Sequence, residues 1–292
     1  MNSEATGNVG SAARRFYWSV RRELWENRSL YLAPLAVAVL ILMASAIGAF
    51  HMPDKLHGAA VDAAQRQRLI EQPFTSAALL LMLTTLVVTV FYCVEALQGE
   101  RRDRSILFWK SLPVSDVTTV LAKASVPLLI LPLLTFAITV VTQAIMLVIG
   151  SVRMMGSDMN PWSHVAFFPM SMMLLFHLVF VHGLWFAPFY GWLLMVSAWA
   201  RRAAFLWATL PLLAIGLLER IAFNSSYFGG MLEHRFTGTP GDHAASGDSM
   251  SMEAMTPAPI QFLTSANFWT GLAVAAVFIA VAVRVRRYRE PG

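Results

Sequence analysis

The stretch EALQGERRDRSILFWKSLPVSDVTTVLAK, residues 95–123, decides the fold because it concentrates charge between two long apolar runs. Its basic residues are Arg101, Arg102, Arg104, Lys110 and Lys123. Basic loops next to membrane spans are retained on the cytoplasmic side. The stretch is therefore predicted to be a cytoplasmic loop between two spans.

Two helical segments are predicted inside this loop. Residues 105–110 form a short amphipathic segment that should end before Pro113, because the residue preceding a proline disfavours the helical backbone. Ser115 and Asp116 are good N-cap residues, so a new helix is expected to start there and to run through Lys123 into the membrane. Phe108, Trp109 and Leu112 would lie at an exposed turn, an unusual apolar patch unless a partner covers it.

The loop resembles the corresponding segment of the permeases of ABC-2-type transporters. The residues that carry the resemblance are Glu95, the step Gly99-Glu100-Arg101 and the turn Ser111-Leu112-Pro113-Val114-Ser115. The resemblance continues over residues 191–220 and along a six-span layout. In that family, the segment docks onto a separate ATP-hydrolysing subunit.

This resemblance implies a permease subunit that couples ATP hydrolysis in another chain to transport, which in this family is mostly export. It implies two copies of a cytosolic ABC ATPase, with ATP and Mg bound there and no cofactor bound by this chain. It also implies a second permease, either identical or related, and a place in the bacterial cytoplasmic (inner) membrane. The loop residues expected to couple the two chains are Glu100, Arg101, Arg104, Phe108, Trp109, Leu112, Pro113 and Ser115.

Composition independently excludes an ordinary soluble domain. Hydrophobic residues make up 57% of the 292 residues and charged residues 13%, with a mean hydropathy of +0.58. The net charge of +5 comes from basic residues that flank apolar runs instead of forming one patch, which argues against nucleic-acid binding. The single cysteine, Cys93, rules out an internal disulfide.

The apolar runs predict an all-α, six-span membrane protein, with a tail and interfacial helix at residues 1–29, a coupling loop at 98–123, an outer loop at 219–261 and a basic tail at 284–292. With this layout, 16 of the 22 lysines and arginines lie on the side assigned to the cytoplasm, which places both termini there. The fourth apolar run is too long for one straight crossing, so an interfacial or re-entrant start is expected at residues 165–169. The predicted spans cover residues 30–50, 74–97, 124–150, 170–199, 203–218 and 262–283.

The segment before the first span is predicted to be an amphipathic helix over residues 12–27, after a polar, non-helical start. Phe16, Val20 and Leu24 fall at i, i+4 and i+8, with Trp25 beside them and arginines around the rest of the helix. This pattern is typical of a helix lying in the membrane interface. A simple basic flank is the alternative.

No catalytic or nucleotide-binding motif is present. A phosphate-binding loop needs glycines and a Lys-Ser or Lys-Thr pair, and Lys110-Ser111 has no glycines around it. There is also no Ser-His-Asp order or His-Glu-x-x-His helix, so an enzyme is not expected. A soft-metal site from the methionines and histidines of residues 231–255 is possible, but a solvated loop is the simpler interpretation.

Three ionisable residues remain as candidates for an intramembrane role. Glu95, at the cytoplasmic end of the second span, could pair with Arg101, Arg102 or the N-terminal helix, or could simply reach the interface. His177 and His182 are deep in the fourth span. On an α-helix, five residues correspond to about 140° of rotation, so these histidines should not share a face. Packing, a substrate path and proton coupling all remain open for them.

Two other classes fit the composition. A proton-linked secondary transporter would need ion sites near the midplane, for which only the histidines qualify. A membrane sensor or assembly factor would need no transport path.

Overall fold

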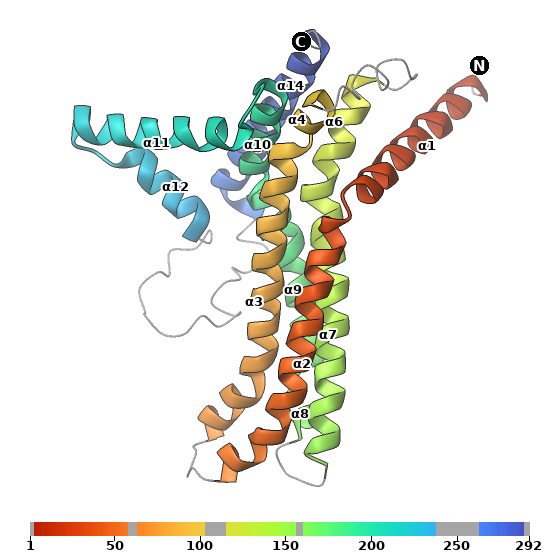
Figure 1. Cartoon of the computed structure of the whole chain (residues 1–292), viewed down its shortest axis with the longest axis vertical. Coiled ribbons are helices and arrows are strands. Elements are labelled where there is room, and N and C mark those ends of the chain that lie inside the picture. Colours follow the sequence, from red (N-terminus) through yellow and green to blue (C-terminus); the bar gives the residue numbers. More distant parts are fainter. Residues whose placement is uncertain (1–2, 58–62, 103–114, 156–159, 238–262, 289–292) are drawn as a thin grey trace.

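The computed structural model describes residues 3–57, 63–102, 115–155, 160–237 and 263–288. Within these residues every regular element is a helix (Figure 1). The predicted all-α class is therefore confirmed for the described part of the chain.

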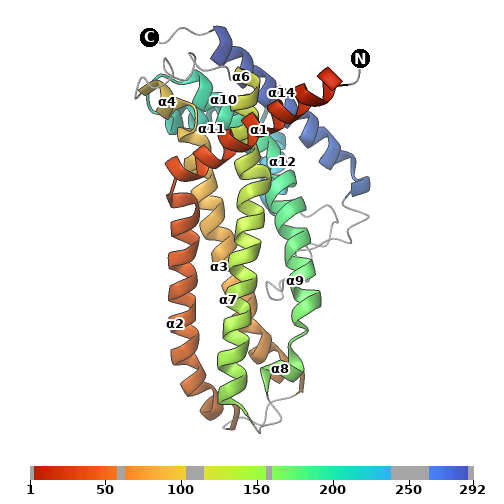
Figure 2. The same ribbon diagram turned by 90° about the vertical axis from the view of Figure 1, so that its right-hand side faces the viewer.

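The N-terminal helix α1, Ser3–Glu26, projects sideways from one end of the bundle, with its C-terminal part packed against α6, and it is longer than predicted (Figure 1). The first residues, expected to be non-helical, belong to it from Ser3 onward. A turn at Asn27 and Arg28 separates α1 from the first apolar helix, α2, Ser29–His57. Figure 2 shows α1 crossing the end of the bundle where α4, α6 and α14 meet.

Helices α2, α3 (Ala63–Glu95) and α7 (Leu131–Arg153) run side by side along most of the bundle (Figures 1 and 2). Polar side chains link α3 and α7 inside this apolar packing: the hydroxyls of Thr85 and Thr135 are 2.7 Å apart, and Gln143 donates to the carbonyl of Phe74 at 3.1 Å. Such bonds between spans stabilise helix association in a membrane.

The charged stretch ends one helix and starts another, as predicted. After α3, the short helix α4 covers Gln98–Arg102, and α6 begins at Asp116 and runs to Ser125. The Ser115 side chain accepts a hydrogen bond from the Thr118 amide at 3.1 Å, which confirms Ser115 as the N-cap. A π-helical turn, η1 (Val126–Ile130), joins α6 to α7 at Pro127, so that one helical run extends from residue 116 to 153.

The fourth apolar run is a single helical path with interruptions. The short helix α8, Pro161–His164, is followed by a break at Val165 and Ala166, close to the interfacial start predicted from the sequence. Next come α9 (Phe167–Phe176), the π-helix η2 (His177–Trp185) and α10 (Ala187–Trp199). Irregular helical segments inside a span are tolerated where neighbouring helices cover them.

Helix α11, Ala204–Phe223, corresponds to the predicted fifth span and extends beyond its predicted end at residue 218, but it lies across the long axis of the bundle (Figure 1). The left-handed backbone of Ala203, with φ of 50°, makes the sharp turn. Trp192 then holds α11 against α10 by donating to the carbonyl of Ala208 at 3.0 Å.

The polar segment after α11 contains helix α12, Tyr227–Thr237. The Glu219 carboxylate accepts hydrogen bonds from the amides of Tyr227 and Phe228 at 2.7 and 2.9 Å, and so caps the first turn of α12. The last helix, α14 (Ala266–Tyr288), packs on α10, where Gly191 allows close approach: a Cβ there would lie 3.2 Å from the Ala275 carbonyl oxygen.

Six helical runs in the described residues are long and apolar enough to cross a membrane, as predicted. Their apolar surfaces remain largely exposed, which suits lipid as the surrounding solvent. Both termini lie at the same end of the molecule (Figure 1).

Candidate functional site

A buried ion-pair network is the most unusual polar feature of the described residues. At its centre the Lys123 ammonium, on α6, lies 2.8 and 2.9 Å from the two carboxylate oxygens of Glu23, on α1. The two side chains are 3% and 1% exposed. Tyr92, on α3, donates to the same carboxylate at 3.1 Å.

Glu100, on α4, extends the network to the C-terminal helix. Its carboxylate lies 3.1 Å from Lys123, 3.3 Å from Arg22 and 2.5 Å from Arg286 of α14. Arg286 also pairs with Asp116, at the start of α6, at 3.1 Å. Three carboxylates and three cations therefore interlock where α1, α4, α6 and α14 meet.

Charge balance explains how these groups can be buried together. An isolated buried charge costs several kcal/mol in lost hydration, whereas a network that pairs each charge and satisfies its hydrogen bonds recovers most of that cost. The edge of the network is less buried: Glu26 lies 3.5 Å from Arg22 and is 46% exposed. Burial raises the pKa of the Glu26 carboxyl, and the nearby Arg22 guanidinium opposes this shift.

A second set of contacts ties α4 to α10. The Ser197 hydroxyl accepts hydrogen bonds from the amides of Leu97 and Gln98, both at 3.0 Å. Arg101 donates to the carbonyls of Ser197 and Ala200 at 2.5 and 2.9 Å. These carbonyls belong to the last turn of α10 and to its C-cap residue, Ala200, where a cation is favourable.

The two sets of contacts anchor both sides of the charged loop. The chain enters the loop through α4, held by Glu100 and Arg101, and leaves it at Ser115 and Asp116, held through Arg286. A displacement of the loop would therefore act on α1, α10 and α14 as well as on the helices on either side of it.

Three of the predicted coupling residues, Glu100, Arg101 and Ser115, lie in the described structure. Glu100 and Arg101 hold the entry to the loop and Ser115 caps the exit. The other five lie outside the described residues: Arg104, Phe108, Trp109, Leu112 and Pro113.

The predicted interfacial helix, residues 12–27, is helical up to Glu26, and its apolar residues differ in burial. Leu24 packs against the bundle core and Val20 is half-buried, whereas Phe16 and Trp25 are exposed. The Arg21 guanidinium lies over the Trp25 ring, 4.6 Å from its centroid. The helix thus presents aromatic and cationic groups away from the bundle, as membrane-interface helices do.

Glu95 does not belong to the buried network. It pairs with Arg102 at 3.4 Å, one of the partners predicted for it, and both side chains are 65% exposed. Exposed pairs of this kind add little stability. The buried acids near this end of α3 are Glu23 and Glu100.

The two histidines of the fourth run are buried, and the expectation that they cannot share a face is wrong. It assumed α-helical geometry, but η2 is a π-helix with i to i+5 hydrogen bonds, so residues five apart are neighbours on one face. Nδ1 of His177 and Nε2 of His182 are buried without a hydrogen-bond partner among the described residues.

The sequence reasoning missed Glu23 and Arg286 as partners in the network, and it treated Lys123 only as part of a basic loop. One signal was available: Glu23 and Glu26 are acids in the otherwise arginine-rich segment that precedes the first span. Within the described residues no group of three His, Cys, Asp or Glu side chains is placed to hold a metal ion.

The fold defines the class: a multi-pass, all-α membrane protein. The chain matches no protein-family model, no curated protein and no solved structure.

Proposed function

We propose that this chain is the permease subunit of an ATP-driven ABC-2-type transporter and that it forms the membrane path for export. The observation that supports this most is the buried network, which fastens both sides of the charged loop to the N-terminal and C-terminal helices. A loop fixed in this way is suited to receive a push from a cytosolic partner and to pass it to several spans.

The loop sequence indicates what the partner contacts. Phe108, Trp109 and Leu112 would offer apolar contacts beside Arg104, and the chain has no phosphate-binding loop of its own. The proposed assembly pairs this chain with a second permease and two cytosolic ATPase subunits, in the bacterial cytoplasmic membrane with both termini in the cytoplasm. ATP-driven closure of the ATPases would tilt α1, α3 and α6 through the network and open a path to the outside.

Mild-detergent purification from native membranes tests the proposal. Mass spectrometry of the bound proteins should find a chain with a phosphate-binding loop, and the eluate should hydrolyse ATP. The same data show whether the second permease is identical to this chain. The chain alone, without ATPase activity in several gentle detergents, would contradict the proposal.

Two loop variants sharpen the test. Trp109→Ala and Pro113→Ala should insert normally but should lose the ATPase partner or uncouple its hydrolysis from transport. Trp162→Ala is the matched control, because Trp162 is 67% exposed on α8, at the opposite end of the bundle. Normal coupling in both loop variants would reject the assigned role of the loop.

One observation favours a second candidate, a proton-linked secondary transporter. Ionisable residues within a span are costly and commonly functional, and the buried pair of His177 and His182 lies on one face of a π-helix. In proteoliposomes, flux that follows an imposed pH gradient and needs no ATPase would support this candidate. Flux that requires ATP and the copurified partner would exclude it.

A further inference from the structure

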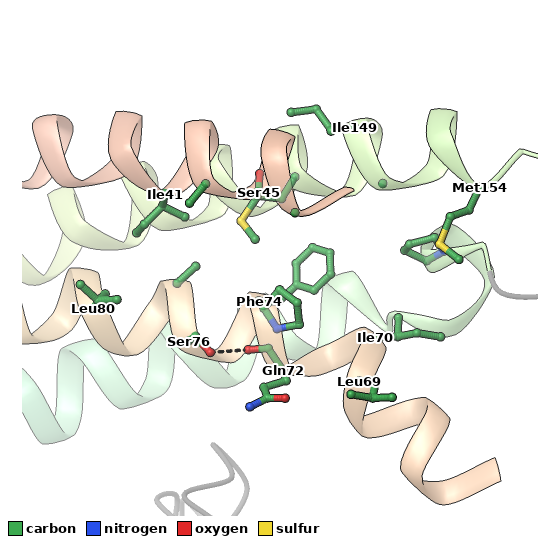
Figure 3. A pocket seen from close by; sticks show the side chains of 17 residues that line it. Ile41, Ser45, Leu69, Ile70, Gln72, Phe74, Ser76, Leu80, Ile149 and Met154 are labelled. Atoms are coloured by element: carbon green, nitrogen blue, oxygen red, sulfur yellow. Dashed lines mark hydrogen bonds between the residues drawn. The ribbon is translucent and has the colours of Figure 1, made fainter. Parts of the chain in front are cut away.

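A cavity of about 720 Å³ opens between α2, α3 and α7, at the end of the bundle away from both termini. Figure 3 shows the Phe74 ring projecting from α3 into the space between these helices, with Ile41 and Leu80 toward one end and Met154 toward the other. The volume lies within the range of small-molecule binding sites.

Small side chains create the hollow. Ala44 and Gly48 on α2 lie one turn apart, and Ala77 on α3 and Gly150 on α7 also line the cavity. A Cβ added at Gly48 would meet nothing within 4 Å. The space on this wall is therefore open, and a larger side chain could occupy it.

The hydroxyl groups that line the cavity are satisfied within their own helices. The Ser45 hydroxyl donates to the carbonyl of Leu42 at 3.1 Å, and the Ser76 hydroxyl donates to that of Gln72 at 2.6 Å (Figure 3). The rest of the wall is mostly aliphatic or aromatic. This lining favours an apolar occupant over a charged one.

One polar feature lies at a single end of the cavity. Pro73 is inside α3 and has no N–H to donate, so it cannot bond the carbonyl of Leu69, four residues earlier. Leu69 lies toward the end nearest the start of α3, and the exposed Gln72 lies between Leu69 and Ser76 (Figure 3). Beyond them, Leu80 and Ile41 mark the apolar end.

The surrounding membrane indicates which molecule occupies the cavity. All three helices are apolar runs of spanning length, and the cavity lies near one end of each run, so membrane lipid is the apolar solvent next to this wall. Water does not stably fill an apolar cavity, and phospholipid acyl chains are the apolar groups in excess at this depth. We propose that the cavity binds one acyl chain of a membrane phospholipid, with the polar end of that lipid near Gln72 and the Leu69 carbonyl. This assignment is independent of the proposed function.

Lipid retention tests the proposal. The full chain is reconstituted with defined phosphatidylcholine, washed in detergent to remove loosely bound lipid, and analysed by native mass spectrometry. Wild type and Met43→Phe should retain a bound phospholipid, whereas Ala44→Phe and Gly48→Phe should lose it. Met43 is the matched control, since it lies on α2 at an exposed position outside the cavity. If the Ala44→Phe and Gly48→Phe variants fold and retain as much phospholipid as wild type, the proposal is overturned.

A measurement on the wild-type chain does not depend on how the variants fold. Phosphatidylcholine with a photoreactive group on its acyl chain is incorporated, the sample is washed in the same way, and the labelled peptides are mapped. Label should concentrate at cavity residues such as Ile149 and the buried Phe74. Label spread equally over exposed positions of the same helices, such as Leu83 and Val141, or lost on washing, would overturn the assignment.

Discussion

Lys123 and Glu23, 100 residues apart in the chain, meet inside the protein with Nζ 2.8 and 2.9 Å from the two carboxylate oxygens. Their contact joins α1 to α6, and Glu100 continues it to Arg286 on α14. The helix before the first span is thereby locked to the end of the last one.

Removing the Lys123 ammonium should destabilise the protein strongly. Lys123→Met leaves Glu23 buried without its main cation, and breaking a buried pair from one side costs about 3–5 kcal/mol. Thermal unfolding of the purified protein in detergent should show a large drop in Tm. The double variant Glu23→Gln/Lys123→Met should recover part of it, because no unpaired charge then remains at that point.

The exposed pair provides the control for this experiment. Arg102→Met breaks the contact with Glu95, where both side chains are 65% exposed, and it should change Tm only slightly. Equal losses for Lys123→Met and Arg102→Met would show that the buried network is not a main source of stability.

Gly183→Ala should destabilise the packing of the two π-helical turns. A Cβ at Gly183 in η2 would lie 2.5 Å from the backbone carbonyl oxygen of Leu128 in η1, so one backbone must move. Overpacking of this kind costs about 1–3 kcal/mol. Thermal unfolding is the measurement, and Gly229→Ala, whose Cβ would meet nothing within 4 Å, is the control. Similar Tm values would contradict the close approach of η1 and η2.

Arg235→Met should release α12 from the bundle. Arg235 donates to the carbonyls of Trp185 and Asn267 and lies over the Trp185 ring. Hydrogen bonds from a charged donor contribute about 1.5–3 kcal/mol. Hydrogen exchange of residues 227–237 should accelerate in this variant, whereas it should stay unchanged in Arg220→Met, whose side chain is exposed. Unchanged exchange in Arg235→Met would show that other contacts hold α12.

Replacing a buried histidine by leucine should leave stability unchanged or raise it. Nε2 of His182 is buried without a partner among the described residues, and an unsatisfied buried polar group costs about 1–3 kcal/mol. His182→Leu and His177→Leu should therefore keep or increase Tm. If the pair serves transport, flux should fall in the same variants. A large loss of Tm would instead indicate a packing role.

The local sequence pattern was sufficient to predict much of the fold. Apolar runs of spanning length predicted six long helices, and Ser115 followed by Asp116 predicted the start of α6 at the correct residue. These features depend on neighbours within a few turns, which periodicity and capping chemistry describe well. For the same reason, the interruption before α9 was anticipated close to its true position.

The candidate site was only partly predictable. Glu100 and Arg101 were chosen, but Glu23 and Arg286 were not, because a charge gives no local sign of a partner 100 or more residues away. The prediction that His177 and His182 lie on different faces was wrong for a different reason. The prediction assumed an α-helix over the whole fourth run, whereas residues 177–185 form a π-helix, which hydrophobic periodicity does not reveal.

The sequence by itself thus determined the class, an all-α chain of six long apolar helices, because burial and lipid exposure follow from composition over each run of about 20 residues. Only the tertiary structure decided which charges meet, that α11 lies across the bundle, and that small residues of α2, α3 and α7 surround a cavity. These features depend on how helices that are distant in the sequence pack against one another. The sequence of one segment does not determine which surfaces will come into contact.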